Sequence, residues 1–189
     1  AEESIQRKAV VYDADGDAHY DTASAFIKSI RGSDPNAAVY WLARMIEGGE
    51  DVKFIARRLL ILSSEDIGNA NPTALIMANN TFQAVATIGY PESRILLSQC
   101  AVYLATSPKS NASYMAIGNA QAVVKQTGDL PVPIHLRNAP TQLMKELDYG
   151  KNYRYAHNEE DAFAAGENYF PEGMAAPGFY RPVAELAHR

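Results

Sequence analysis

The sequence predicts an all-α fold of about seven helices, followed by an irregular, tyrosine-rich tail. Prolines stand where first helical turns would begin, because proline lacks the N–H that has no partner there. Glycines follow where helices would end. Between these residues the apolar side chains recur at three- and four-residue steps, and residues 20–127 hold no convincing alternating strand pattern.

The N-terminal part of this pattern predicts three helices. The first is expected near residues 21–30. The second, over 34–47, begins at Asp34-Pro35. The third, over 51–67, is apolar almost all round, which is typical of a central helix covered on several sides.

Four more helices are predicted by the same signals, and their ranges are 72–87, 91–106, 111–127 and 140–147. The residues that mark them are Asn71-Pro72, Pro91 and Ala139-Pro140 at the starts, with Gly89, Gly128 and Gly150 beyond the ends. In the helix over 111–127, small residues recur every four positions at Ala112, Ala116 and Ala120. This alanine seam would let another helix approach closely, either inside the subunit or across a subunit interface.

Composition narrows the class of protein. The 189 residues carry a net charge of −5, which argues against a wholly basic nucleic-acid binder. The single cysteine excludes an intrachain disulfide and a multi-cysteine metal site, so a reducing, cytosolic compartment fits best. No apolar run reaches the roughly 18 residues of a membrane span, and no membrane partner is expected. Because the chain begins with Ala1 and a charged stretch, we expect it to be cut from a longer protein.

The chain lacks the signature of a nucleotide-binding phosphate loop. Such a loop needs Gly, four residues and then Gly-Lys-Ser/Thr, so that backbone amides surround the phosphates and a hydroxyl binds magnesium. The Gly150-Lys151 pair is followed by Asn152, and Lys145 stands where the first glycine should be. We therefore expect no ATP binding by this route, no other cofactor and no catalytic residue in this chain.

Two other kinds of site find weak support. The four histidines, His19, His135, His157 and His188, are too far apart in sequence for a common zinc motif. A small hydrolase centred on Cys100 and His135 is another hypothesis, but the sequence shows no third group that would activate this pair. Cys100 also lies on the apolar stripe of its helix, where a buried cysteine acts as a small hydrophobe.

Adjacent carboxylates end the central helix at Glu65 and Asp66. Neighbouring residues diverge by about 100° around a helix, so these two cannot flank one scissile bond. We expect them to pair with Arg57, with Arg58 or with a neighbouring helix, in a structural role.

Residues 134–157 form the most unusual stretch. This stretch contains four basic and two acidic residues, a net charge of +2, and three tyrosines interleave with the basic residues in the sequence. The candidate contacts to DNA or to a partner are Arg137, Lys151, Tyr153, Arg154 and Tyr155. Cations of this kind neutralise phosphates while tyrosines stack on bases. In the alternative interpretation the tyrosines anchor the tail to the helices and the cations are solvated.

Four sequence blocks carry a resemblance: SIRGSDP from Ser29, ARR with SSEDIGNA up to Ala70, SPKSN from Ser107 and LRNAPT from Leu136. They closely resemble the C-terminal part of the replication-associated recombination protein A family, also called MgsA. Its eukaryotic relatives include the Werner helicase-interacting protein. The resemblance runs from about Ser24 to Phe170, and the tail after Pro171 departs from the pattern.

The resemblance implies a module without chemistry of its own. Family members are AAA+ ATPases similar to clamp loaders, with ATP and magnesium bound in an N-terminal module absent from this chain. Residues 1–20 would then be a linker from that module, 21–147 a helical oligomerisation domain resembling the clamp-loader collar, and 148–189 a tail packed on the helices. The family also implies a homo-tetramer, DNA-dependent ATP hydrolysis at stalled forks, a link to single-stranded-DNA-binding protein, and a cytoplasmic, nucleoid-associated location.

Within this family pattern, His135, Arg137 and Asn138 belong to a block of that module. A buried network fixing the loop into the last helix, or a subunit contact, is expected for them rather than acid–base catalysis. Two compatible hypotheses of different class remain: an oligomerisation and scaffolding domain, and a nucleic-acid-binding module that uses residues 149–157.

Overall fold

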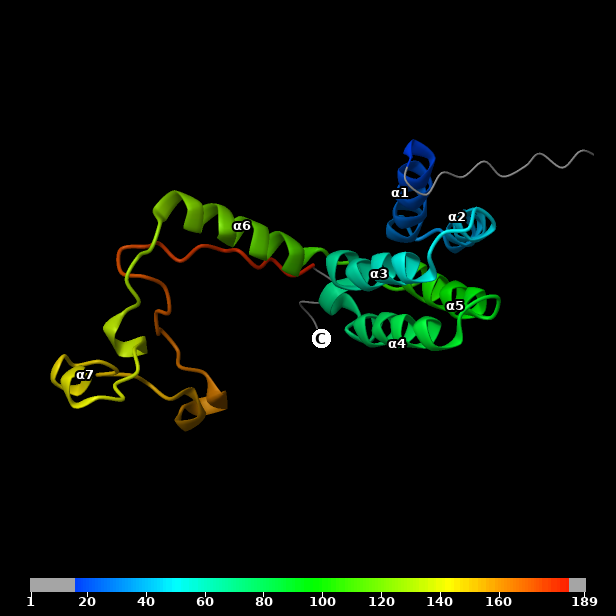
Figure 1. Ribbon diagram of the computed structural model, residues 1–189. Helices are drawn as coiled ribbons and strands as arrows, with labels where there is room; N and C mark the ends of the chain where they lie inside the picture. The colour runs from blue at the N-terminus through cyan, green and yellow to red at the C-terminus, as the bar shows by residue number, and fades with distance from the viewer. Residues whose placement is uncertain (1–15, 184–189) are drawn as a thin grey trace, which may run out of the picture. The chain divides into compact units, whose positions relative to one another are not determined.

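A computed structural model describes residues 16–183, and these residues form helices, turns and irregular segments but no β-strand. The described part contains seven α-helices (Figure 1): α1 (Asp17–Arg31), α2 (Pro35–Glu47), α3 (Val52–Leu62), α4 (Thr73–Ile88), α5 (Ser93–Ala105), α6 (Ala112–Thr127) and α7 (Gln142–Glu146). The predicted all-α fold is confirmed. None of these helices is long and apolar enough to cross a membrane.

The first two helices follow from the residues at their ends. Helix α2 has Pro35 in its first turn, and the Asp34 side chain accepts a hydrogen bond of 2.9 Å from the backbone N–H of Ala37. Helix α1 begins at Asp17 rather than near residue 21, because its buried stripe extends back to His19. The rest of the expected linker, residues 1–15, lies outside the described residues.

The central helix changes its geometry part of the way along. Helix α3 is α-helical to Leu62, and a π-helical turn, η1 (Ser63–Ile67), and a 3-10 turn, η2 (Gly68–Ala70), follow it. Helix α3 packs against α1, α4 and α5, as its apolar character predicted. Its coverage is incomplete, however, because Ile61 is 45% exposed.

Some of the predicted end signals lie just outside their helices. Pro72 is the N-cap of α4 instead of a residue of its first turn. Helix α5 begins at Ser93, after a cis peptide bond between Tyr90 and Pro91. Gly150 lies in a turn beyond the end of α7.

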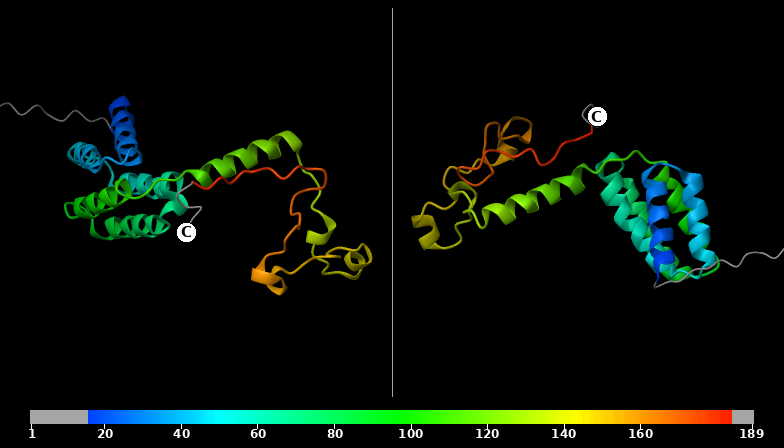
Figure 2. Two further views of the ribbon diagram at one scale, coloured as in Figure 1. Left: turned by 180° about the vertical axis from the view of Figure 1, so that it is seen from behind. Right: turned by 90° about the horizontal axis from the view of Figure 1, so that it is seen from above.

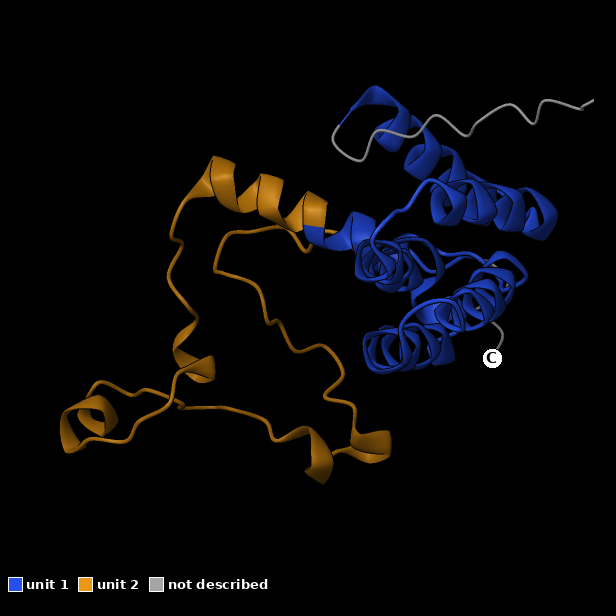
Figure 3. Cartoon of the chain, turned by 45° about the vertical axis from the view of Figure 1, so that its right-hand side comes forward, with its two compact units in different colours: residues 1–117, 180–189 blue, residues 118–179 orange. Residues whose placement is uncertain are grey.

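The chain separates into two compact units (Figure 3). Unit 1 holds residues 1–117 with 180–189, of which 16–117 and 180–183 are described, and unit 2 holds residues 118–179. The division therefore falls inside α6, some distance before residue 148, where the tail was expected to begin.

Unit 1 is a helical bundle around one hydrophobic core. Helices α1 to α5 lie side by side in it (Figure 2). The side chains at its centre are fully buried, and they include Phe26, Ile30, Met45, Ile55, Leu59, Leu62, Ile67, Leu97 and Leu104. This core is the product of the helical apolar spacing in the sequence.

Unit 2 contains the second half of α6, helix α7, and three 3-10 turns: η3 (Ile134–Leu136), η4 (Ala156–Asn158) and η5 (Glu160–Ala162). Its one buried residue is Ala164. Phe170, Met174 and Phe179 of the tail line an apolar hollow of about 350 Å³ together with Val123 and Val124 of α6. The tail side chains that meet a helix there are therefore phenylalanines and a methionine, while Tyr153, Tyr155 and Tyr169 are each more than half exposed.

Candidate functional site

Three of the four sequence blocks meet in unit 1. The end of α1 supplies Arg31, the π-helical turn η1 supplies Glu65 and Asp66, and the loop before α6 supplies Lys109. The Arg31 Nε donates to Asp66 Oδ1 over 2.8 Å, and Arg31 Nη2 lies 3.7 Å from Glu65 Oε1. The hydrogen bond to Asp66 raises the pKa of Arg31. The two carboxylates therefore pair with a neighbouring helix, one of the arrangements expected, while Arg57 is exposed.

Lys109 fastens its loop to the same place. Its Nζ donates to the carbonyl oxygens of Ala105 and Ser107 at 3.0 and 2.7 Å, and to Ser33 Oγ at 3.0 Å. Burial lowers the pKa of Lys109, and the nearby charge of Asp66 opposes that change. The lysine is thus held by three oxygens, from the end of α5, the loop after it and the loop between α1 and α2.

Gly68 allows the two loops to approach. It has φ 50° and ψ −134°, a backbone conformation open to glycine, and a Cβ there would lie 3.2 Å from the carbonyl oxygen of Ser110. The N–H of Ser110 donates over 2.8 Å to the carbonyl oxygen of Asp66. The buried Asp66 Oδ2 accepts no hydrogen bond from the described residues. This network of two cations and two carboxylates fastens the loop before α6 to η1 and to the end of α1.

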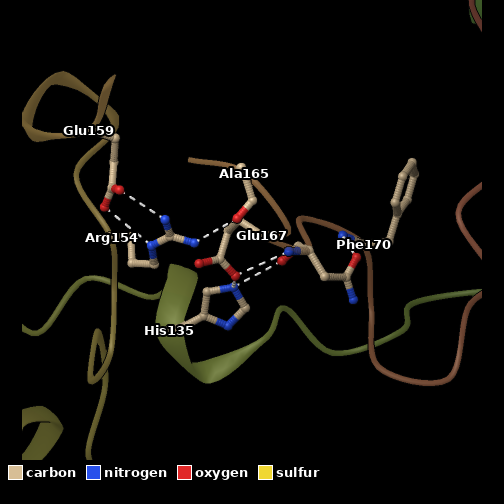
Figure 4. A network of polar contacts seen from close by, with 7 residues as sticks. His135, Arg154, Glu159, Ala165, Glu167 and Phe170 are labelled. Carbon is tan, nitrogen blue, oxygen red and sulfur yellow. Dashed lines mark hydrogen bonds and ion pairs between the residues drawn. The ribbon is translucent and has the colours of Figure 1, made fainter. Parts of the chain in front are cut away.

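A second set of polar contacts organises unit 2 (Figure 4). His135, on η3, has its Nε2 2.9 Å from the carbonyl oxygen of Asn168 and 3.2 Å from Glu167 Oε1. Arg154 donates from Nε and Nη2 to the two carboxylate oxygens of Glu159, at 3.2 and 2.9 Å, and from Nη1 to the carbonyl oxygen of Ala165 at 2.9 Å. These contacts attach the segment 159–168 to the stretch 134–157, which contains His135 and Arg154.

The electrostatics of this set follow from the same contacts. The hydrogen bond from Arg154 lowers the pKa of Glu159, and the same bond raises the pKa of Arg154. His135 lies at an open hollow of about 690 Å³ whose other titratable lining residues are Asp148, Lys151, Glu167 and Glu172. Carboxylates thus outnumber the cations there, so this hollow does not favour a phosphate.

The other residues of the block lie nearby in unit 2. The Nε of Arg137 donates to the carbonyl oxygen of Val132 over 2.7 Å, and its guanidinium lies 5.0 Å from the ring centroid of Tyr149. Asn138 is exposed and lines a second hollow with Arg137, Tyr149 and Tyr153. The structure thus brings Arg137 and Tyr153 together, while His135 is tied to the tail segment.

The candidate DNA contacts of residues 149–157 are only partly free. Lys151 Nζ lies 3.3 Å from Asp148 Oδ2, and Arg154 is bound as described above. Tyr153 and Tyr155 are 52% and 53% exposed. The aromatic rings are accessible for stacking, but both cations already have carboxylate partners.

Cys100 does not have the surroundings of a nucleophile. It is fully buried in the core of unit 1, and burial raises its pKa to about 11. Because the thiolate is the reactive form, such a thiol is almost entirely protonated at neutral pH. His135 belongs to the other unit. Among residues 16–183, no three His, Cys, Asp or Glu side chains are placed to hold a metal ion.

The alanine seam crosses the division between the units. Ala112 is buried at the start of α6 in unit 1, and Ala116 and Ala120 are partly exposed. Ala120 lines the apolar hollow that also contains Phe170 and Phe179. Large apolar neighbours on the same helix are exposed: Tyr114 by 52%, Ile117 by 60% and Val124 by 60%.

Sequence reasoning missed a buried pair in unit 1. His19 Nδ1 lies within hydrogen-bond distance of Glu50 Oε2, and both residues are buried. The Phe54 ring lies 4.7 Å from the His19 ring, centroid to centroid. His19 was placed in the expected linker, although Thr22, Phe26 and Ile30 continue its stripe at helical spacing. That spacing is the signal that would have found it.

Comparison with known proteins identifies relatives along most of the chain. Residues 32–189 match the family model described as MgsA AAA+ ATPase C terminal, and residues 1–31 match the model described as AAA C-terminal domain. Replication-associated recombination protein A of Coxiella burnetii is 51% identical over 91% of this chain and 39% of its own length. The Escherichia coli K12 protein of the same name is 49% identical over 91% and 38%. ATPase WRNIP1 of Dictyostelium discoideum is 43% identical over 93% and 20%. The chain thus spans about two fifths of the length of these bacterial relatives.

Proposed function

We propose that this chain, which belongs to the MgsA AAA+ ATPase C-terminal family, is the oligomerisation and scaffolding domain of a clamp-loader-like ATPase. The parent protein would act in DNA replication, recombination and repair at stalled forks. Its ATP and magnesium would bind in a module outside this chain, and this chain would hydrolyse no ATP. The names of the relatives support the setting, since they are replication-associated recombination proteins and an ATPase.

One observation carries the assignment of an assembly role. Unit 2 has defined polar contacts but a single buried residue, Ala164. Meanwhile Leu143 is 65% exposed, Leu147 52% and Phe163 70%. A folded segment of this size normally buries far more apolar surface, and exposed apolar clusters mark interaction surfaces. A second copy of the chain would supply the missing cover.

Helix α6 supports the same proposal. Its small residues, Ala116 and Ala120, are only partly covered, and a helix from another subunit would be able to approach closely there. We favour a homo-tetramer, with DNA and single-stranded-DNA-binding protein as partners of the parent protein and a nucleoid-associated location.

A nucleic-acid-binding module built on residues 149–157 is the second candidate function. The half-exposed rings of Tyr153 and Tyr155 favour it. The ion pairs of Lys151 and Arg154 weigh against it, because each must be broken before its cation binds a phosphate.

The mass of the chain in solution tests the assembly role. We expect light scattering at tens of micromolar to give four times the 20.6 kDa of one chain, in high salt as well as low, because the contact is apolar. The double substitution Leu143→Asp with Phe163→Asp should lower the mass, whereas Ile76→Asp with Ile88→Asp, at exposed positions of α4 in unit 1, is the matched control. A strict monomer, or an equal loss in the control, would contradict the proposal.

A further inference from the structure

A groove runs along unit 1 between α1 and α3. Helix α1 contributes Tyr20, Ser24, Lys28 and Arg31 to its wall, and α3 contributes Phe54 and Arg58. Ala23 and Ile27 complete the lining of this hollow of about 330 Å³. No carboxylate lines it among the described residues, in contrast to the hollow at His135 in unit 2.

Helical spacing explains why these side chains share one groove. Tyr20, Ser24 and Lys28 stand four residues apart on α1, and Arg31 comes three residues later. Residues three and four apart lie above one another on a helix face. On α3, Phe54 and Arg58 are again four apart. Each helix therefore presents an aromatic ring toward its start and a cation further along.

Two of the cations in the groove have no partner among the described residues. Within residues 16–183, the side chains of Lys28 and Arg58 make no ion pair and no hydrogen bond, whereas Arg31 is bound to Asp66. Lys28 is exposed and Arg58 is partly exposed, so both can reach a ligand. Lys151 and Arg154 of unit 2, by contrast, are each occupied by a carboxylate. A pair of unneutralised cations beside a concave surface favours an anionic ligand.

The aromatic ring in the same groove narrows the chemistry of that ligand. Tyr20 is 67% exposed, and its ring is supported edge-on by His19 at a centroid distance of 5.0 Å. An exposed ring that shares a groove with unpaired cations is the arrangement that stacks on bases while the cations meet phosphates. An acidic peptide would use the cations but would gain little from an exposed ring.

We infer that this groove binds single-stranded nucleic acid, with Lys28 and Arg58 on phosphates and Tyr20 stacked on a base. The choice of partner rests on the proposed function at DNA, and it deepens that function by placing a strand contact in unit 1. The groove itself does not depend on the self-association proposed for unit 2.

Fluorescence anisotropy of a labelled oligothymidylate with the full chain, over a range of salt, tests the inference. In the double variant Lys28→Ala with Arg58→Ala, the negative slope of log K against log salt should become shallower by roughly 1.4, since each single-strand phosphate contact contributes about 0.7 to its magnitude. The matched control, Lys151→Ala with Arg154→Ala, removes the same charge from paired cations and should leave the slope unchanged. Tyr20→Ala should weaken binding roughly ten-fold.

Two further measurements keep the outcomes distinct. Arg58→Lys keeps the charge and should keep the salt slope, which separates a phosphate contact from a folding defect. Light scattering on the same samples reports self-association, so a monomeric chain that still binds the strand would overturn the assembly role and leave the groove standing. Unchanged affinity in the Lys28 and Arg58 double variant, or equal losses in both double variants, would overturn the groove. An oligoglutamate peptide that competes as well as the strand would also overturn it, in favour of an acidic partner.

Discussion

Unit 1 and unit 2 are held together by different kinds of interaction. Unit 1 buries the side chains of five helices in one core, in which Ile55, Leu59 and Leu104 have no exposed surface. Unit 2 buries only Ala164 and relies on contacts such as those of His135 with Asn168 and of Arg154 with Glu159. One unit is therefore stabilised by burial of apolar surface, and the other by polar contacts between loops.

The two units also differ in how their basic side chains are paired. In unit 2 three cations of the stretch 134–157, Arg137, Lys151 and Arg154, have oxygen partners and help to fasten the loops. In unit 1 the core holds the helices together, and within residues 16–183 the side chains of Lys28 and Arg58 make no ion pair. The difference shows that a cluster of basic residues in a sequence is no guide to free charge until its partners are known.

Removing a core side chain should give the largest difference in stability between a variant of unit 1 and a variant of unit 2. Leu59→Ala deletes methyl groups from a site with no exposed surface, so we expect the free energy of unfolding to fall by about 2–5 kcal/mol. The matched change in unit 2, Leu143→Ala, removes a side chain that is 65% exposed in a single copy, so at concentrations low enough to keep the chain monomeric it should change the free energy of unfolding by about 0.5 kcal/mol or less. Urea titration followed by circular dichroism measures both. Similar losses would show that Leu143 is covered by another surface under the conditions used.

The sequence predicted the helices of unit 1 well for a physical reason. Apolar burial imposes a repeat of three and four residues that is visible without the structure, and Asp34-Pro35 marked the start of α2 closely. The buried stripe on α1 was missed at His19, because a histidine does not count as apolar in such a pattern.

The polar contacts could not be predicted in the same way. Arg31 and Asp66 are far apart in sequence, and their pairing depends on the π-helical turn at η1, which no periodic pattern indicates. A neighbouring helix was among the expected partners of Asp66, but neither Arg31 nor Lys109 was singled out. In unit 2 one partner of His135 is a backbone carbonyl, and a carbonyl is present at every residue. The residue types were therefore identified there, but not their contacts.

A smaller effect should come from the junction of the two loops in unit 1. Gly68→Ala places a side chain at φ 50° and 3.2 Å from the carbonyl oxygen of Ser110, so the free energy of unfolding should fall by about 2–3 kcal/mol. Gly49→Ala is the matched control in the same unit, because its φ is 82° but nothing lies within 4 Å of the new Cβ. It should cost about 1–2 kcal/mol from the backbone conformation alone. Thermal unfolding of both variants gives the difference, and equal losses would mean that the loop of Ser110 moves freely away from Gly68.

The smallest expected effect lies in unit 2, at the exposed pair of Arg154 and Glu159. The hydrogen bond from Arg154 lowers the pKa of Glu159, so Arg154→Ala should raise that pKa toward its ordinary value. An NMR titration of the Glu159 carboxyl carbon measures the change. Because the folded pKa is lowered, the pair contributes stability above the ordinary pKa of glutamate, and that contribution is lost as the pH falls through the lowered value. Lys151→Ala is the control, since its partner is Asp148 and the pKa of Glu159 should stay where it is. If Arg154→Ala also leaves the pKa of Glu159 unchanged, Arg154 is free in solution. Its cation would then be as available to a phosphate as Lys28 and Arg58 are in unit 1.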